Sequence, residues 1–263
     1  MISYRKPHRY KKRKPIYRNR FFWLGLLAIV FFFSIFYFLF LSGFFQVEKI
    51  IISGENKVSA EEINSAVESK LENKILFWPT KSIFLVNLAE MEKDVLASFP
   101  QLAEIEIKRN FPDGISVILI ERKGLAQWFS GEQYFLLDSA GIVFEKMAEA
   151  DPNLAAIEKV GQVELGEGVI NPNDLNKILE IDYQMKTDLK IPVKDYLIYA
   201  EDKLTVLTQE DWEIYFNLQT DVKWQLTKLK TVLEEKIPQE RRKDLQYIEL
   251  RFGNFAPFKY RAP

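Results

Sequence analysis

The sequence has no cysteine and only one histidine, His8, which lies in a basic N-terminal segment. Without cysteine there can be no disulfide framework, thiolate zinc site, iron–sulfur cluster or cysteine nucleophile. A single histidine in such a segment also argues against a Ser-His-Asp triad and against a histidine-rich metal site. These absences remove most of the side chains on which metal-dependent and histidine-based catalysis relies.

Motifs for phosphate and dinucleotide binding are also missing. Gly166-Glu167-Gly168 fits neither G-x-x-x-x-G-K-[ST] nor G-x-G-x-x-G. Acidic pairs such as Glu61-Glu62 and Glu234-Glu235 fall in predicted helices, and we interpret them as solvated charge. A glycosidase-type pair of carboxylates is the catalytic alternative that the sequence leaves open. Because no set of converging polar groups can be named, we predict a protein that is not an enzyme and needs no cofactor or metal.

The net charge of −1 conceals a strong separation of charge along the chain. Residues 1–20 contain nine basic residues and no acidic one, namely Arg5, Lys6, Arg9, Lys11, Lys12, Arg13, Lys14, Arg18 and Arg20. Basic segments of this kind mark the cytoplasmic side of a membrane-spanning helix. We therefore interpret residues 1–20 as a cytoplasmic tail and topology signal. Binding to nucleic acid or anionic lipid is the weaker alternative, and we predict no nucleic-acid partner.

An uncharged stretch of 25 residues follows, from Phe21 to Phe45. It exceeds the ~20 helical residues that cross a bilayer, and Phe21, Trp23 and Phe45 lie near its ends, as interfacial aromatics do. A cleavable signal peptide has a shorter apolar core of about 7–15 residues and an A-x-A-like site, which residues 41–44 lack. We predict an uncleaved single-pass anchor, with the N-terminus in the cytoplasm and the remaining chain outside.

The residues after the anchor show alternating strand and helix patterns. The predicted elements are a strand at 47–52, a helix beginning near Ser59, a long connection at 73–86, a helix at 87–99, an alternating strand at 103–108 and a strand at 115–120. In the first helix, Ile63, Val67 and Leu71 fall on one face. The last strand is apolar on both faces, which favours a central position in a sheet. The order β-α-α-β-β allows two helices to pack on a three-stranded sheet.

A longer motif runs through the first of these elements. The pattern F-x-V-x-x-I-x-I-x-G-x-N-x-V-S-x-x-E-I is matched from Phe45 to Ile63. Pro100, Pro112, Glu121-Arg122, Ala126 and Trp128 follow in order. This ordered set resembles the POTRA domain of the FtsQ/DivIB bacterial division proteins. In one departure, Gly124 occupies the position of a proline usual in that family, which implies a looser entry into the next domain.

The remainder reads as a mixed β-rich domain with two or three helices. Its predicted elements are a hairpin turning at 138–141, a helix starting at 171–172, strands at 196–199, 203–208 and 212–218, a helix from 221, and a final strand at 246–252. Residues 145–171 are poorly patterned. The fold class is therefore α+β, and the family layout that the resemblance implies gives a cytoplasmic tail at 1–20, a transmembrane helix at 21–45, a POTRA domain at 46–123, a β domain at 124–252 and a C-terminal tail at 253–263.

The C-terminal strand and the aromatic residues after it form the candidate binding site. A sheet edge offers unpaired N–H and C=O groups, so a partner can add a strand there. The candidate residues are Tyr247, Glu249, Arg251, Phe252, Phe255 and Phe258. Alternatively, the phenylalanines close the protein's own core.

The resemblance implies a partner for this strand. In the family, the late β-domain strand and its tail bind the membrane-proximal segment of an FtsB/DivIC-like subunit that is paired with an FtsL-like protein. The family segment reads L-R-Y-x-x-G; here Leu250, Arg251 and Phe252 match its start, and Phe255 stands at the glycine position. The implied function is that of a bitopic scaffold at the division septum, which links cytoplasmic and membrane division proteins to the septal wall-synthesis machinery. A POTRA protein of secretion or envelope assembly and a wall-modifying enzyme are the alternatives.

Overall fold

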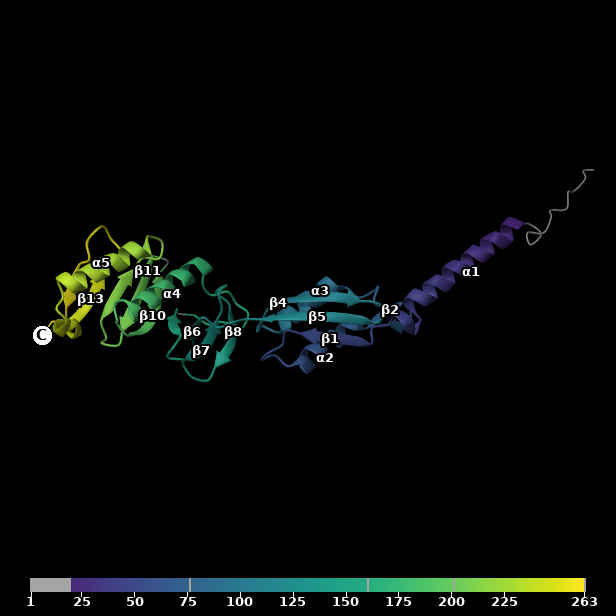
Figure 1. Cartoon of the computed structure of the whole chain (residues 1–263), viewed down its shortest axis with the longest axis horizontal. Helices are drawn as coiled ribbons and strands as arrows, with labels where there is room; N and C mark the ends of the chain where they lie inside the picture. Colours follow the sequence, from purple (N-terminus) through teal and green to yellow (C-terminus); the bar gives the residue numbers. More distant parts are fainter. Residues whose placement is uncertain (1–19, 76, 160, 201, 263) are drawn as a thin grey trace, which may run out of the picture. The chain divides into compact units, whose positions relative to one another are not determined.

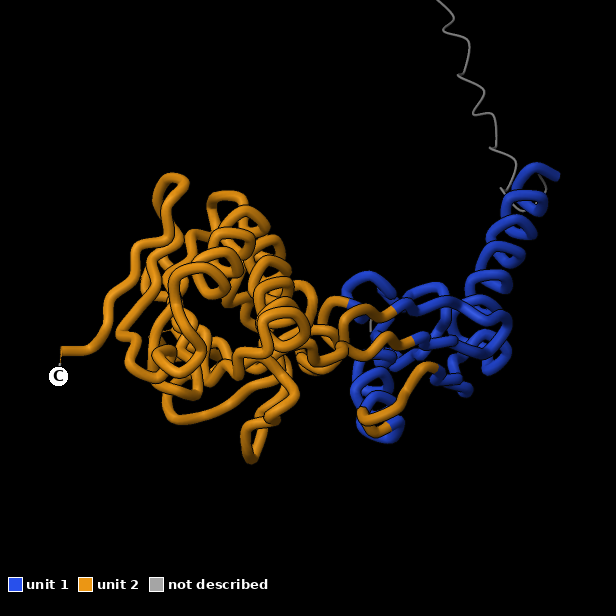
Figure 2. Tube along the Cα trace, turned by 60° about the vertical axis from the view of Figure 1, so that its left-hand side comes forward, with its two compact units in different colours: residues 1–53, 60–92, 106–118 blue, residues 54–59, 93–105, 119–263 orange. Residues whose placement is uncertain are grey.

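The computed structural model describes residues 20–75, 77–159, 161–200 and 202–262 (Figure 1). The predicted topology signal at Arg5, Lys6, Arg9, Lys11, Lys12, Arg13, Lys14 and Arg18 lies outside the described residues, whereas Arg20 begins helix α1. The chain forms two compact units (Figure 2). Unit 1 comprises, among the described residues, 20–53, 60–92 and 106–118, and unit 2 comprises 54–59, 93–105 and 119–262.

Helix α1 spans Arg20–Phe40 and is long and apolar enough to cross a membrane. Phe21 and Trp23 lie exposed in its first turn. The helix ends five residues before the predicted boundary, and Phe45 lies half-buried in the short 3₁₀ helix η2 at Gly43–Phe45. Beyond Phe40 the helical bonding pattern breaks, because the N–H groups of Leu41 and Ser42 both donate to the carbonyl of Tyr37, at 2.9 Å each. The Ser42 hydroxyl also donates to the carbonyl of Phe38.

A three-stranded sheet in the order β1-β5-β4 follows the helix (Figure 1). Its strands are β1 at Lys49–Ser53, β4 at Leu102–Asn110 and β5 at Gly114–Glu121, with α2 at Ala60–Leu71 and α3 at Leu88–Ser98 between β1 and β4. Strand β1 runs parallel to the central strand β5. The predicted β-α-α-β-β order and the central position of β5 are confirmed, and so is the buried face of α2.

Strand β5 is central in its sheet, and its two faces differ in burial. Ile115, Val117 and Leu119 are buried, whereas Ile118 and Ile120 on the opposite face are 37% and 51% exposed. One face of the strand is therefore covered and the other is open.

The predicted connection at 73–86 contains a small hairpin. Strands β2 at Asn73–Ile75 and β3 at Trp78–Thr80 pair antiparallel. Three-residue strands are too short to show a readable alternation, so the sequence pattern misses them.

The turn that follows β1 depends on Gly54. Its φ angle is +91°, and a Cβ added there would lie 2.1 Å from the carbonyl oxygen of Leu119, so only glycine fits. One carboxylate oxygen of Glu121 then accepts the backbone N–H groups of residues 56, 57 and 58, at 2.7, 2.9 and 3.0 Å. The glycine and the glutamate of the sequence motif thus both hold this turn against β5.

This arrangement predicts a pH dependence of stability. Burial raises the pKa of Glu121, but the three N–H donors outweigh it and bring the pKa below its ordinary value. A carboxyl whose folded pKa is lowered stabilises the fold above its unfolded pKa of about 4.3, and this contribution is lost as the pH falls through the folded pKa. We expect Glu121→Gln to lower the melting temperature at pH 7 and to flatten its decline between about pH 5 and 3. Circular dichroism melts of the full chain in detergent test this, and an unchanged decline would contradict it.

The second sheet has nine strands in the order β14-β13-β12-β11-β10-β9-β6-β7-β8. The strands are β6 at Ala126–Ser130, β7 at Gln133–Leu137, β8 at Val143–Met147, β9 at Ala155–Glu158, β10 at Val193–Ala200, β11 at Lys203–Thr208, β12 at Glu213–Phe216, β13 at Leu245–Glu249 and β14 at Phe258–Tyr260. Strand β9 runs parallel to both β6 and β10, and β12 runs parallel to β13, so the sheet is mixed. The predicted hairpin is confirmed as β7–β8.

Two helices, α4 at Pro172–Thr187 and α5 at Val222–Glu235, lie side by side on this sheet (Figure 1). A further 3₁₀ helix, η3, spans Gln239–Asp244 before β13. The predicted stripe of α5 is confirmed, because Val222, Leu226, Leu229, Leu233 and the following Ile237 are all buried in the core. These side chains form one hydrophobic cluster with Trp128 of β6, Phe216 of β12 and Trp212, which directly precedes β12.

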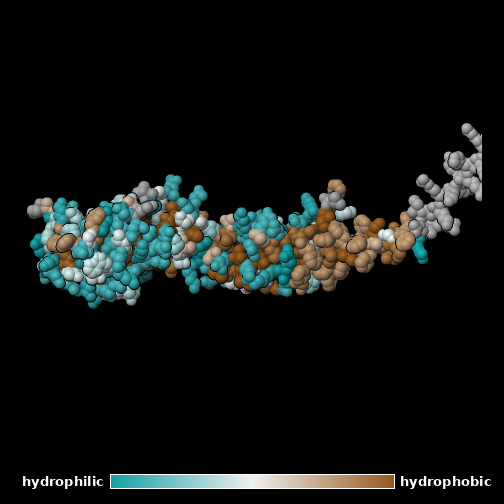
Figure 3. Space-filling view, turned by 90° about the horizontal axis from the view of Figure 1, so that it is seen from above, coloured by the Kyte–Doolittle hydropathy of each residue, from teal (hydrophilic) through white to brown (hydrophobic). Residues whose placement is uncertain are grey.

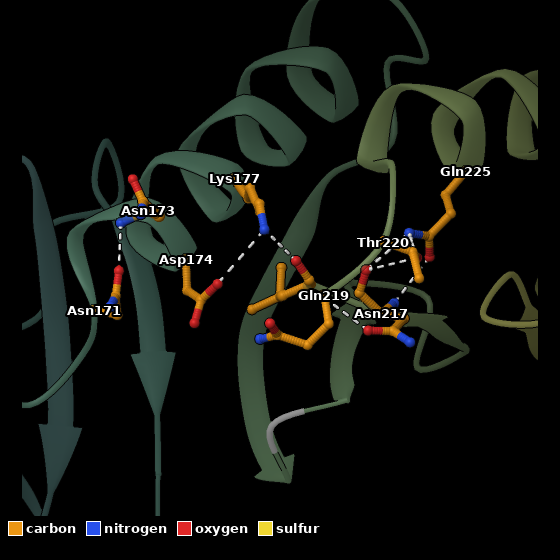
Figure 4. Close-up of polar contacts among 9 residues, drawn as sticks. Asn171, Asn173, Asp174, Lys177, Asn217, Gln219, Thr220 and Gln225 are labelled. Atoms are coloured by element: carbon orange, nitrogen blue, oxygen red, sulfur yellow. Dashed lines mark hydrogen bonds and ion pairs between the residues drawn. The ribbon is translucent and has the colours of Figure 1, made fainter.

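Polar side chains fix the start of each helix (Figure 4). Asn171 caps α4 by accepting the N–H of Asn173 at 2.8 Å, and Asp221 caps α5. Gln225 exchanges two 2.8 Å hydrogen bonds with the backbone of Asn217 and so ties the β12–α5 loop to the helix that it enters.

The family departure at Gly124 lies next to the side chain of Leu136. A Cβ at this position would lie 2.8 Å from Cδ2 of Leu136. A larger residue at 124 would therefore require the Leu136 side chain to shift.

Candidate functional site

The C-terminal segment forms a hairpin rather than a strand followed by a tail. Strand β13 ends at Glu249, three residues before the predicted end, and β14 lies within the predicted tail at 253–263. Gly253, with a φ angle of +53°, lies in the connection between the two strands, which pair antiparallel. The chain therefore turns back and adds one more strand at the end of the sheet.

Strand β14 is an edge strand, because β13 is its only neighbour among the strands that the structure describes. The N–H of Glu249 donates to the carbonyl of Pro257 at 2.8 Å, and the N–H of Arg261 donates to the carbonyl of Asp244 at 2.8 Å. Backbone groups alternate in direction along a strand. The N–H and C=O groups of Phe258 and Tyr260 thus point away from β13, toward the open edge. Such an edge can accept an added strand.

The three predicted phenylalanines differ in burial, which bears on whether they are available to a partner or close the protein's own core. Phe258 is half-buried against the core cluster and makes an edge-to-face contact with Tyr260 at 5.6 Å between ring centroids. Phe252 is 63% exposed and Phe255 is 81% exposed. One ring therefore closes the protein's own core, and two rings are left at the surface beside the edge strand.

Tyr247, Glu249 and Arg251 contact one another or their neighbours on the side of β13 opposite the buried Ile248 and Leu250. Tyr247 stacks on Tyr215 of β12 with centroids 5.4 Å apart. Arg251 donates two hydrogen bonds to the Glu249 carboxylate, at 2.8 and 3.0 Å, and this contact raises the pKa of Arg251.

The surroundings of Tyr215 extend the same network. Burial, and next the hydrogen bond to Glu213, raise the pKa of the Tyr215 phenol. The Lys203 ammonium lies 4.4 Å from the centroid of the Tyr215 ring, within cation–π distance. Glu249 and Arg251 are thus paired, and Tyr215 is held between Glu213, Lys203 and Tyr247.

An open groove of about 710 Å³ lies between α5 and the turn that leads into β14. Its lining includes Trp224, Val232, Phe255 and Phe258, and Trp224 is 47% exposed. Lys228 on the same helix donates to the carbonyls of Leu250 and Gly253, at 2.6 and 3.0 Å, and burial lowers its pKa. This lysine anchors the turn that presents Phe252 and Phe255.

Sequence reasoning missed β14, Trp224 and Lys228. The alternation Phe258-Lys259-Tyr260 is a strand signal, but it is short and follows several turn residues. Lys228 lies beside the apolar stripe of α5 in the sequence, but its burial and its contacts with the turn are visible only in the structure.

Comparisons with known proteins identify the first part of the chain. The POTRA domain, FtsQ-type, matches residues 45–122. Over 110 residues the chain is 30% identical to the cell division protein FtsQ of Rickettsia bellii, which covers 42% of this chain and 38% of that protein. Over 102 residues it is 26% identical to the cell division protein DivIB of Clostridium acetobutylicum, which covers 39% of this chain and 37% of that protein.

The matched segments therefore span less than two fifths of these relatives. A solved structure, the major extracytoplasmic domain of the trans isomer of the division protein DivIB from Geobacillus stearothermophilus, aligns over 46% of this chain and 97% of its own. Its sequence identity is 14% and its TM-score is 0.26, which is too low to establish a shared fold.

Proposed function

Because this chain belongs to the FtsQ/DivIB family of cell division proteins, with an FtsQ-type POTRA domain at residues 45–122, we propose that it is a non-enzymatic scaffold of the bacterial division complex. It links cytoplasmic and membrane division proteins to the septal wall-synthesis machinery through protein–protein contacts. The observation that carries this proposal is the FtsQ-type POTRA domain directly behind an apolar helix.

In this proposal α1 crosses the cell membrane once, at the division septum. Its 21 residues rise about 32 Å, which matches a hydrocarbon core of about 30 Å. The basic residues before it keep the N-terminus in the cytoplasm. The POTRA domain at 46–123, the β domain at 124–252 and the segment at 253–263 then lie outside the cytoplasm.

The partner site in this proposal is the edge of β14 with the rings of Phe252 and Phe255. An FtsB/DivIC-like subunit, paired with an FtsL-like protein, adds a strand to this edge and covers the rings. Support comes from the outward backbone groups of β14 and from the exposure of both rings. Confinement of α1 to the membrane raises the effective concentration of partners in the same bilayer, so weak contacts suffice. The edges of the β1-β5-β4 sheet are a second docking surface.

The experiment is a capture assay with the full chain in detergent and the membrane-proximal segments of the FtsB/DivIC-like and FtsL-like proteins from the same genome. We expect Phe252→Glu to weaken capture at least about tenfold, because a charge replaces an apolar anchor at the interface. Tyr183→Glu is the matched control, since Tyr183 on α4 is also an aromatic residue that is 63% exposed. It should change capture less than about twofold.

Two results would count against the proposal. Equal loss with both variants would show a general effect of surface charge. No capture by the unmodified, folded chain would remove these partners and leave the POTRA sheet edges as the docking surface to examine.

A further inference from the structure

Unit 1 exposes an unusual number of aromatic side chains near the C-terminal end of α1. Phe44, Phe77, Trp78, Phe84 and Phe111 are 56%, 91%, 61%, 40% and 57% exposed. They come from four separate segments: η2, the β2–β3 hairpin, the loop before α3 and the turn after β4. We call these five residues the aromatic collar. Scattered exposed apolar residues are ordinary, but a contiguous set marks an interaction surface.

Ring contacts connect most of the collar to the helix. Phe38 of α1 stacks on Phe44 at 5.7 Å between centroids, and Phe40 lies 6.3 Å from Phe84. Phe84 in turn lies 5.7 Å from Phe111. Ring contacts therefore join Phe44, Phe84 and Phe111 to the end of the helix, and the brown and tan surface in Figure 3 extends from the helix onto the adjoining end of unit 1.

Hydrogen bonds hold the β2–β3 hairpin against the same helix end. The Thr80 hydroxyl donates to the carbonyl of Phe40 at 2.6 Å, and the Ser82 hydroxyl donates to the carbonyl of Leu39 at 3.0 Å. The Gln46 amide also donates to the Phe40 carbonyl, at 3.2 Å. These donors satisfy carbonyls that a helix end leaves without partners. No flexible spacer therefore separates α1 from the segment that carries Phe77 and Trp78.

Hydrogen bonds and buried side chains fix the loop at residues 83–86 in a conformation that exposes Phe84. Arg109 donates to the carbonyls of Ile83 and Val86, at 2.7 Å each. The side chains of Ile83 and Val86 are buried, whereas those of Phe84 and Leu85 between them stay at the surface. The buried residues and the arginine fix the loop, so Phe84 cannot turn into the core without breaking these contacts.

The length of α1 determines where the collar lies relative to the bilayer. If α1 spans the bilayer as proposed above, its end at Phe40 reaches the boundary between hydrocarbon and headgroups. Aromatic side chains concentrate at this boundary in membrane proteins. We propose that the aromatic collar inserts into the outer lipid–water interface of the same membrane, and that it seats the POTRA segment of unit 1 directly on the lipid. The occupant of this surface is the phospholipid interface, which is continuous with the lipid around α1.

The proposal rests on the membrane anchoring of α1, so the test measures both separately. The natural chain contains no cysteine, and single cysteines therefore allow clean spin labelling. Labels are placed at Phe77→Cys in the hairpin, at Phe111→Cys, at Ile29→Cys within α1, and at Glu62→Cys, which is exposed at the start of α2. The full chain is reconstituted into phosphatidylcholine–phosphatidylglycerol vesicles. Collision rates with oxygen, which concentrates in lipid, and with a water-soluble nickel chelate then report the depth of each label.

We expect the labels at 77 and 111 to collide with the nickel chelate at least about threefold less often than the label at 62, and with oxygen more often, as interfacial groups do. An aqueous signal at 77 and 111 with a lipid signal at 29 would overturn the collar and leave the anchor standing. An aqueous signal at 29 as well would overturn the anchoring itself. Shielding of 77 and 111 from both reagents would indicate a protein contact, and it would also overturn the proposal.

Two substitutions made with the spin label kept at 111 control for local effects of the label itself. With the label kept at 111, Trp78→Asp should raise its collisions with the nickel chelate, because a carboxylate in the hairpin draws this side of the collar toward water. Lys57→Asp lies outside the collar and should leave the label at 111 unchanged. Equal effects of the two substitutions would contradict a specific insertion of the aromatic collar into the interface.

Discussion

Replacing Tyr260 with proline is expected to weaken capture of the proposed strand-adding partner strongly while the fold stays intact. The N–H of Tyr260 points to the open edge of β14, so proline removes a donor that only an added strand would use. The hydrogen bond from Arg261 to the Asp244 carbonyl, on the inner side, remains. Loss of one main-chain bond, together with the clash of the proline ring, should weaken capture more than about tenfold.

Two further variants make this result interpretable. Tyr260 also contacts Phe258 and lies 4.1 Å from the Arg241 guanidinium, so Tyr260→Ala controls for the loss of the ring. It keeps the N–H and should retain most of the capture. Lys259 pairs with Tyr247 on the inner side, so Lys259→Pro should break the hairpin and lower the melting temperature.

Capture assays with the full chain, together with circular dichroism melts, distinguish these outcomes. If Tyr260→Pro binds as well as Tyr260→Ala, the partner does not add a strand to β14. The exposed rings of Phe252 and Phe255 would then carry the contact alone.

Replacing Asp138 with asparagine is expected to destabilise unit 2 by about 3–5 kcal/mol, since it leaves a buried guanidinium without its counter-ion. The Arg122 and Asp138 side chains are 13% and 7% exposed and form a direct ion pair. The other Asp138 oxygen accepts the N–H groups of Ala140 and Ile142 at 2.9 Å each. Asparagine keeps an acceptor for this β7–β8 turn, so the loss reports mainly on the charge.

The double variant Arg122→Met with Asp138→Asn provides the control. Removing both charges leaves no unpaired ion, and the double variant should recover much of the stability lost in Asp138→Asn. Arg122 also donates to the carbonyl of Pro100 at 3.0 Å, so recovery should be incomplete. Thermal and urea unfolding measure both variants. A cost below about 1 kcal/mol for Asp138→Asn would show that solvent screens this pair.

Local patterns in the sequence were sufficient for the long elements. The long apolar helix follows from the absence of charge between Phe21 and Phe45, and the β-α-α-β-β order follows from alternation and helical spacing. The buried stripe of α5 was also readable, because a helix repeats its inner face every three to four residues. The family resemblance was carried by residues with local reasons, such as Gly54, where no Cβ fits.

The candidate site was only partly readable. The sequence indicated a C-terminal strand followed by aromatic residues, and it left open whether these bind a partner or close the core. The structure has β13 at the expected place, with Phe252 and Phe255 exposed. It could not indicate that Phe258 belongs to a further strand and closes the core, because this depends on a chain reversal at Gly253.

The sequence by itself determined the apolar helix, the order of the POTRA elements and the amphipathic faces, since each depends on periodicity within one segment. Only the tertiary structure decided the nine-strand order, the parallel placement of β9 between β6 and β10, the open edge at β14 and the gathering of four segments into the aromatic collar. These features depend on pairings between residues far apart in the chain. Hydrophobic patterns specify which face of a strand is buried, but they do not specify which strand lies beside it.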